Sequence, residues 1–153
     1  MNAPPIYTTD FSKLDDTETV GEALQRMLAD RVSDLPVVDR SGKLIGMFKL
    51  EELYASLLPK AALIGKGMTD LSFASETLAE LRQKMDEIDD RPVHEFVVVP
   101  RHVVHEDTTP IEIVLLLHQG ENNVPVVDRA GGRLIGMVSA RELLIALLPG
   151  GKR

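Results

Sequence analysis

The sequence predicts an α/β protein assembled from two copies of a strand–helix–strand–strand–helix unit. Internal repetition is the first reason for this prediction. "PVVDR" occurs at 36–40 and again at 125–129, and "LIGM" occurs at 44–47 and again at 134–137. The second reason is patterning, because short β-branched runs and stretches with helical apolar spacing alternate in the same order in both copies. Duplication of one structural unit explains both observations.

Each copy opens with an extended stretch, at 5–11 in the first and 96–107 in the second. A helix follows at 19–30 and at 109–119, where Thr19 and the pair Thr109-Pro110 are typical helix starts. Two short buried strands joined by a glycine turn come next. An amphipathic helix that stops at a proline closes each copy, at 49–58 and 139–148. One copy alone cannot bury both faces of its small sheet, so we expect the two to pack together.

Composition narrows the possible functions. Of 153 residues, 44% are hydrophobic and 27% are charged, which is typical of a globular protein and not of a disordered one. The net charge of −7 argues against a nucleic-acid partner. The absence of cysteine excludes disulfides and thiolate catalysis. No apolar run approaches the ~18 residues that span a bilayer, and the first ten residues lack signal-peptide features. We therefore expect a cytoplasmic protein with no membrane partner.

Three segments are expected along the chain. Residues 1–59 form the first repeat, 60–92 an insertion, and 93–153 the second repeat. The insertion is too long for a turn. Ser75 is a suitable N-cap, and the apolar residues at 78, 81, 85 and 88 fall on one helical stripe, which predicts a helix at about 75–90. We favour packing of this helix on the protein's own edge over binding of a partner.

The stretches "RVSDLPVVDRSGKLIGMFKLEEL" and "NNVPVVDRAGGRLIGMVSAREL" resemble the signature of the CBS domain, named after cystathionine β-synthase. The resemblance covers roughly residues 6–59 and 96–149. It implies a tandem pair, or Bateman module, in which the two sheets pack into a pseudo-two-fold disc. It also implies two clefts between the repeats, which in the family often hold AMP, ADP, ATP or S-adenosylmethionine. Such modules usually regulate an attached or associated enzyme, channel or transporter.

The resemblance also implies ligand-binding residues. In the family a strand ends in Gly-h-h-Thr/Ser-x-x-Asp, whose hydroxyl meets a phosphate and whose acid holds the ribose diol. The stretch 136–142 matches with Ser139 as the hydroxyl and with Glu142 in place of the Asp, and Arg141 adds a charged donor. A helix N-terminus is also physically suited to a phosphate. First-repeat residues complete the adenine side. The expected residues of this better cleft are Val32, Ser33, Asp34, Met137, Ser139, Arg141 and Glu142.

Two alternatives remain open at these positions. Ser139 and Glu142 have the spacing of a capping box, which needs no ligand. The matching stretch of the first repeat, 46–52, has Lys49 where the family has a hydroxyl. Lys49 either contacts a phosphate or pairs with Glu52 and fills the cleft. The expected residues of this weaker cleft are Met47, Lys49, Glu52, Thr109, Asn122 and Asn123.

No pattern in the chain predicts catalysis or metal binding. His102 and His105 lie three residues apart on an extended stretch and therefore point to opposite faces, so they do not share an ion. The acidic run at 86–91 lacks the glycine and the spacing of a calcium loop. No serine-nucleophile motif, phosphate loop or dinucleotide fingerprint occurs. We expect no catalytic residue, no metal and no required cofactor.

The leading hypothesis is a stand-alone regulatory module. It binds an adenosine-containing ligand in a cleft between its repeats and modulates an effector protein that the sequence does not identify. The alternative is a structural or dimerisation module with empty or self-filled clefts. Because the closing helices of both repeats carry apolar residues on more than one face, we also expect a homodimer.

Overall fold

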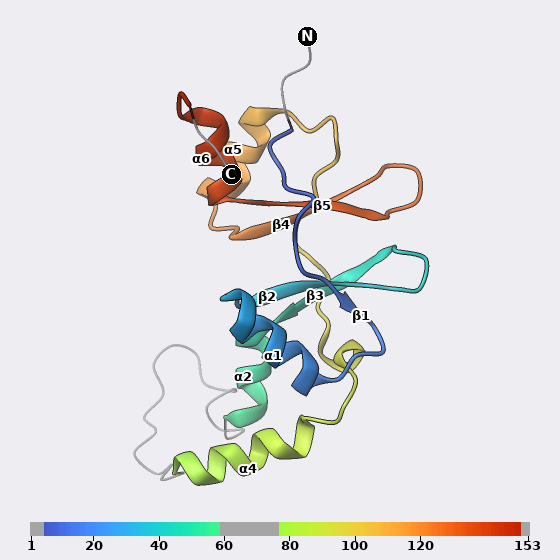
Figure 1. The fold of residues 1–153 in the computed structure, drawn as a ribbon, viewed down its shortest axis with the longest axis vertical. Coiled ribbons are helices and arrows are strands. Elements are labelled where there is room, and N and C mark those ends of the chain that lie inside the picture. The colour runs from blue at the N-terminus through green and yellow to red at the C-terminus, as the bar shows by residue number, and fades with distance from the viewer. Residues whose placement is uncertain (1–4, 59–76, 151–153) are drawn as a thin grey trace.

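The predicted order of elements is confirmed in the computed structural model, which describes residues 5–58 and 77–150 (Figure 1). The first repeat contains β1 (Leu14–Asp15), α1 (Val20–Asp30), β2 (Asp34–Val38), β3 (Leu44–Lys49), α2 (Leu50–Tyr54) and the 3₁₀ helix η1 (Ala55–Leu57). The insertion and the stretch after it contain α4 (Leu78–Ile88) and the 3₁₀ helix η2 (Val93–Phe96). The second repeat contains α5 (Pro110–His118), β4 (Asn123–Val127), β5 (Leu134–Ser139) and α6 (Ala140–Leu147).

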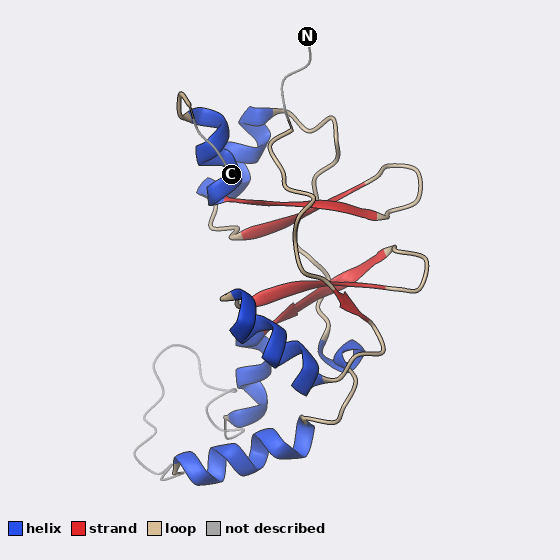
Figure 2. Ribbon diagram, viewed as in Figure 1, coloured by secondary structure: helices blue, strands red, loops and turns tan. Residues whose placement is uncertain are grey.

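The two sheets face each other in the middle of the molecule, and the helices lie outside them (Figure 2). The first sheet has the order β1-β2-β3, and the second pairs β4 with β5. Equivalent residues pair in equivalent register, since Pro36 lies opposite Met47 and Pro125 lies opposite Met137. All four of these residues are buried. The residues next to them along each strand pack against the helices, so these four lie on the opposite face of their sheet. Each sheet is therefore covered on both faces, which requires both repeats.

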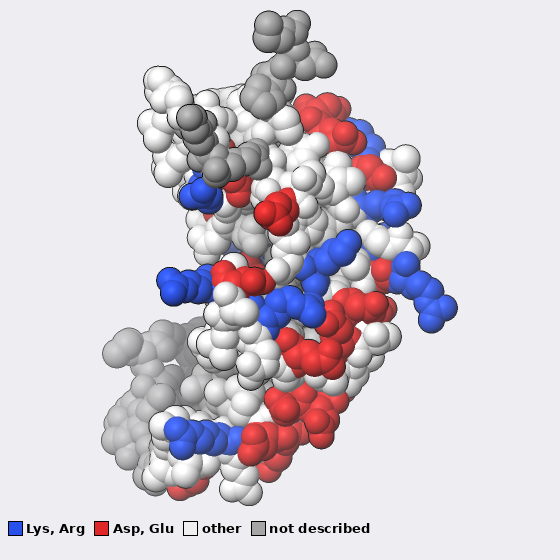
Figure 3. Space-filling view, in the orientation of Figure 1, with Lys and Arg blue, Asp and Glu red and all other residues white. Residues whose placement is uncertain are grey.

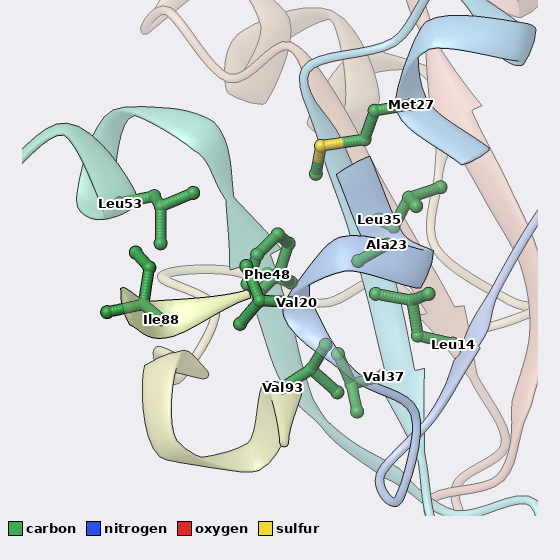
Figure 4. Packing of buried hydrophobic residues seen from close by; sticks show 10 residues of the cluster. All are labelled: Leu14, Val20, Ala23, Met27, Leu35, Val37, Phe48, Leu53, Ile88 and Val93. Carbon is green, nitrogen blue, oxygen red and sulfur yellow. The ribbon is translucent and has the colours of Figure 1, made fainter. Parts of the chain in front are cut away.

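Each repeat has its own hydrophobic core between its sheet and its helices. In the first repeat, α1 contributes Val20, Ala23 and Met27, which are spaced to lie on one helical face. Figure 4 shows these side chains packed toward Leu35 and Phe48 of the sheet. The core of the second repeat is smaller and contains Val104, Ile113, Val124, Val126 and Val138.

The insertion helix α4 packs on the first repeat. Thr77 caps it by accepting a hydrogen bond from the Glu80 amide at 3.2 Å, whereas the expected cap, Ser75, lies outside the described residues. Ile88 at the end of α4 belongs to the core of the first repeat. The chain after α4 then accepts hydrogen bonds from the start of α1, because the carbonyl of Arg91 receives the Val20 amide at 2.9 Å. This side of the first repeat is covered by the protein itself.

The structure differs from the predicted elements in three places. The opening strand of the first repeat is β1 at Leu14–Asp15 and not the predicted stretch 5–11, in which Thr8 forms only a bridge to the second sheet. The predicted helix at 49–58 ends its α-helical part at Tyr54 and continues as the 3₁₀ turn η1. The opening stretch of the second repeat pairs with its own sheet only through a single bridge from Val104 to Val126. The chain turns directly afterwards, because the His105 amide donates to the Thr108 hydroxyl at 2.8 Å. That turn ends the strand at one residue.

The extended opening stretches are exchanged between the repeats. Thr8 and Met137 of the second sheet exchange two backbone hydrogen bonds of 3.0 Å. Val98, which is 90 positions after Thr8, does the same with Met47 of the first sheet at 2.8 and 2.9 Å. Each stretch then crosses to the sheet of its own repeat, as the N-terminal segment shows where it passes β5 on its way to β1 (Figure 1). The two repeats are thereby joined by backbone pairing in both directions.

The glycine of "LIGM" makes this exchange possible. A Cβ atom on Gly46 would lie 2.5 Å from the carbonyl oxygen of Val98, and one on Gly136 would lie 3.0 Å from that of Thr8. Real Cβ atoms do not come within 2.5 Å of a backbone oxygen, so the exchanged segment fits against position 46 only when that residue is glycine. The same steric requirement explains why glycine occupies this position of the tetrapeptide in both repeats.

We predict that Gly46→Ala lowers the free energy of unfolding by about 2 kcal/mol, because the added methyl group pushes the exchanged segment off β3. Gly131→Ala is the matched control, since its nearest neighbour would be 3.8 Å away and its effect should stay within about 0.5 kcal/mol. Urea denaturation of both variants measures the difference. Equal stability of the two variants would contradict the role given to Gly46.

Candidate functional site

A cleft of about 560 Å³ lies between the repeats on the side of Ser139, and we call it the Ser139 cleft. Residues of both repeats line it, in two stretches from the first and two from the second: Thr8, Asp10, Phe11 and Ser12; Asp30 to Leu35; Asn122 and Asn123; and Met137, Ser139 and Glu142. The structure thus brings together six of the seven residues expected in the better cleft. Arg141 is the exception, because it is exposed on α6 and does not line the cleft.

Ser139 occupies the N-cap position of α6 but does not cap the helix. Its side chain accepts no hydrogen bond from the first turn. The threonines that precede α1, α4 and α5 each do so, at 3.2 to 3.4 Å. The Ser139 hydroxyl instead donates to the Glu142 carboxylate at 3.3 Å. The capping box proposed as the alternative is therefore not formed, and the first amides of α6 receive no side-chain cap from Ser139.

Glu142 is the one charged residue that is buried in the part of the chain that the structure describes, with 8% of its surface exposed. It lines the Ser139 cleft from the first turn of α6. Its Oε1 accepts the hydrogen bond from Ser139, and no described residue donates to its Oε2. A buried carboxylate oxygen without a donor is costly, so a ligand hydroxyl or cation in the cleft would relieve it.

A second cleft of about 590 Å³ lies on the side of Lys49, and we call it the Lys49 cleft. Lys49, Glu52, Asn122 and Asn123 line it as expected. Two other expected residues do not. Met47 is buried between the sheets, and Thr109 is used to cap α5 in a full capping box with Glu112. Among the described residues Lys49 forms no ion pair with Glu52, so the self-filled arrangement is not seen.

Asp34 and Asn123 meet between the two clefts and line both of them. They occupy equivalent strand positions, opposite Lys49 and Ser139 respectively. The Asn123 amide donates to the Asp34 carboxylate at 3.1 Å. Burial raises the pKa of Asp34 above its ordinary value of 3.8, and the hydrogen bond from Asn123 opposes that rise only in part.

Sequence reasoning missed the contribution of the exchanged segments. Thr8, Asp10, Phe11 and Ser12 wall the Ser139 cleft, and Val98, Val99 and Arg101 wall the Lys49 cleft. The signal that could have found them is the spacing of 90 residues, which relates Phe11 to Arg101 in the same way as it relates the two glycines. The missing step was the exchange itself, which local patterning does not reveal.

The histidines form no joint site. His105 contacts the Val127 carbonyl through Nδ1 at 2.9 Å, and His102 lies 3.9 Å from Glu121. Within residues 5–58 and 77–150, no three His, Asp or Glu side chains gather as potential metal ligands. No helix in those ranges is long and apolar enough to cross a membrane.

Charge on the face in Figure 3 is mixed. Acidic side chains gather over the first repeat in the lower half, and several Lys and Arg side chains stand near the boundary between the repeats. On this face the described basic residues are interspersed with acidic ones. The net charge of −7 is thus not offset there by a separate basic surface.

The family that matches the chain is described as "CBS domain", and it matches at residues 4–58 and 87–149. A curated relative is the CBS domain-containing protein CBSX1, chloroplastic, of Arabidopsis thaliana, which is 26% identical over 147 residues. That match covers 91% of this chain but only 60% of the length of the relative.

Solved structures agree on the fold. The CBS-pair protein CBSX2 of Arabidopsis thaliana superposes with a TM-score of 0.68 at 23% identity, covering 92% of this chain and 89% of that chain. CBSX2 has also been solved in complex with AMP, with a TM-score of 0.63 at 23% identity and coverage of 93% and 90%. At these identities the likeness establishes the shared fold.

We predict that Asp34 makes the protein less stable as pH rises. Because its pKa is higher in the folded state, the folded protein holds this proton more tightly, and that advantage disappears as pH rises from about 4 through the raised pKa. The free energy of unfolding of the parent relative to Asp34→Asn should therefore fall over that range. Urea denaturation at several pH values measures it.

Asp107→Asn is the control of opposite sign. The hydrogen bond from Arg129 lowers the pKa of Asp107, so its stabilisation is present above the ordinary value of 3.8 and is lost as pH falls below it. The free energy of unfolding of the parent relative to Asp107→Asn should therefore increase as pH rises in the acid range. If the free energy of unfolding of the parent relative to Asp34→Asn also increases with pH, the proposed effect of burial on Asp34 is refuted.

Proposed function

This chain belongs to the CBS domain family as a tandem pair, and from that premise we propose that it is a regulatory module that binds an adenosine-containing ligand in the Ser139 cleft. In this proposal the module modulates an effector protein and does not itself catalyse a reaction. The proposed location is the cytoplasm. The chain spans 60% of the length of the curated relative, so an activity of that whole protein can be assigned to this chain only as a proposal.

One observation carries the proposal: Ser139 and Glu142 lie in the cleft wall at the start of α6, and neither forms a capping interaction with that helix. Ser139 makes no cap, and Glu142 is buried with one oxygen lacking a donor among the described residues. The cleft volume of about 560 Å³ lies within the range of roughly 300–1,000 Å³ that is usual for small-molecule sites. The AMP complex of CBSX2, which has the same fold, supports an adenosine ligand in general.

The residues have distinct proposed roles. Glu142 accepts hydrogen bonds from the ribose diol, which supplies the missing donor to its carboxylate. The first amides of α6 and the Ser139 hydroxyl bind the polar group attached to the ribose. Val32, Ser33 and Asp34 face them across the cleft and contact the adenine, largely through backbone groups. The Lys49 cleft is the weaker adenosine site, because no hydroxyl stands at its corresponding position.

We predict that Ser139→Ala weakens adenosine binding about tenfold and leaves stability within about 0.5 kcal/mol of the parent. The affinity loss is that of one hydrogen bond to a ligand, and stability is spared because no cap is removed. Isothermal titration with adenosine and urea denaturation measure the two effects.

Thr19→Ala is the matched control for this experiment. Thr19 caps α1 at 3.2 Å and lines neither cleft, so its loss should cost about 1 kcal/mol of stability with unchanged adenosine affinity. If Ser139→Ala binds adenosine as tightly as the parent, the assignment of Ser139 to a ligand is incorrect.

A second role, as a homodimer, is favoured by the apolar surface of α5 and α6. These two helices contact each other in the second repeat. Four of their apolar side chains are more than half exposed: Ile111, Leu115, Leu144 and Leu147. Exposed apolar side chains on two helices that contact each other are typical of an interface where they form one patch. We propose that two copies meet through it in an isologous contact.

We predict that the parent sediments as a dimer at micromolar concentration and that Leu144→Asp sediments as a monomer, because a charge at the centre of an apolar contact must be desolvated. Leu78→Asp is the control, since Leu78 is 62% exposed on α4, away from α5 and α6. Analytical ultracentrifugation distinguishes these outcomes. A monomeric parent would rule out the dimer.

A further inference from the structure

The Ser139 cleft is strongly acidic. Among the described residues, four carboxylates line it, contributed by Asp10, Asp30, Asp34 and Glu142, whereas Arg31 is the one cation. Even if Asp34 holds a proton, three carboxylates face one guanidinium. The cation that the family motif was expected to add, Arg141, does not line the cleft.

These carboxylates are not neutralised by ion pairs. Among the described residues, none of the four forms a salt bridge with Lys, Arg or His. Asp30 accepts a hydrogen bond from the Ser12 hydroxyl, and Asp34 accepts one from Asn123. Glu142 is more than nine-tenths buried and lines the cleft, and one of its oxygens has no donor within residues 5–58 and 77–150. The cleft therefore presents negative charge that a ligand must meet.

The size of the cleft makes this charge effective. A compact cavity of about 560 Å³ is roughly 10 Å across, which is comparable to the Debye length of about 8 Å at physiological ionic strength. A charge placed inside is therefore incompletely screened from the walls. A phosphate, with nearly two negative charges at neutral pH, is repelled by three or four carboxylates, whereas a cation is attracted.

We propose that the adenosine ligand of the Ser139 cleft carries a cationic group in place of a phosphate, and that it is a sulfonium compound of the S-adenosylmethionine class. This inference rests on the proposed function and decides between the ligand classes that it leaves open. The sulfonium meets the acidic wall. The carboxylate of the methionyl part meets the uncapped amides at the start of α6, where negative charge is favourable.

The two clefts differ in their balance of charge. Among the described residues the Lys49 cleft is lined by two cations, Lys49 and Arg101, and by four carboxylates, from Asp34, Glu51, Glu52 and Glu121. Its excess of negative charge is therefore smaller than that of the Ser139 cleft, where four carboxylates face one cation. Asp10 and Asp30 line only the Ser139 cleft, so substitutions at these two positions report on that site and not on the other.

The test is a set of calorimetric titrations of the parent protein with four compounds: S-adenosylmethionine, S-adenosylhomocysteine, adenosine and AMP. The first two form a matched pair, because they differ by one methyl group and by the positive charge on sulfur. We expect S-adenosylmethionine to bind about tenfold more tightly than S-adenosylhomocysteine, and AMP to bind more weakly than adenosine, both with and without Mg²⁺. The sulfonium preference should shrink as salt is raised.

Variants assign the preference to the Ser139 cleft. Asp10→Asn and Asp30→Asn should each reduce the ratio of S-adenosylmethionine to S-adenosylhomocysteine affinity about threefold while changing adenosine affinity little, because adenosine is neutral. Asp86→Asn is the control, since Asp86 is exposed on α4 and lines neither cleft. It should leave the ratio unchanged.

The outcomes separate this inference from the proposed function. If AMP binds more tightly than adenosine, or the sulfonium preference is absent, or Asp10→Asn and Asp30→Asn leave it unchanged, the cationic ligand is refuted while an adenosine-binding module stands. If none of the four compounds binds, the proposed function fails and the inference fails with it.

Discussion

The exchange of opening segments between the repeats is the interaction on which the rest of the structure depends. Each repeat supplies a stretch of chain that pairs with the sheet of the other, at Thr8 with Met137 and at Val98 with Met47. Both contacts require the absence of a side chain at the glycine beside them. The two sheets cannot separate without losing these four hydrogen bonds, and neither sheet has its full set of strand partners without the other repeat. The clefts exist because this pairing sets the distance between the repeats.

The same exchange explains why the clefts are composite. An exchanged segment that leaves one sheet for the other passes along the boundary, so its residues become cleft wall. Asp10 and Ser12 reach the Ser139 cleft in this way, and Arg101 reaches the Lys49 cleft. Duplication followed by substitution in these short segments can change the charge of one cleft without affecting the other or the hydrophobic cores. The acidic character of the Ser139 cleft comes in part from such positions.

The fold was predictable because its signals are local and occur twice. Apolar spacing located the helices, β-branched runs located the hairpin strands, and repetition showed that two units share one structure. The site was predictable only in part. Ser139, Glu142 and Asp34 were found through a motif, but Asp10 and Arg101 were not, because their place depends on a crossing between units that no local pattern encodes. Whether Ser139 caps α6 was also undecidable from spacing, since the capping box and the ligand motif use the same residue types. Only the geometry of the hydroxyl separates them.

The hydrogen bond between Asn123 and Asp34 has a consequence for both clefts together. These two residues stand where a perfectly symmetric pair would place two identical side chains, and an acid facing an amide makes the bond directional. Both residues line both cavities. A molecule that draws Asp34 toward itself on one side withdraws an acceptor from Asn123 on the other. Thermodynamic reciprocity then requires that occupancy of either cavity alters the affinity of its neighbour by the same factor. If both cavities bind ligands as proposed, the duplicated protein is one two-site receptor with a common partition.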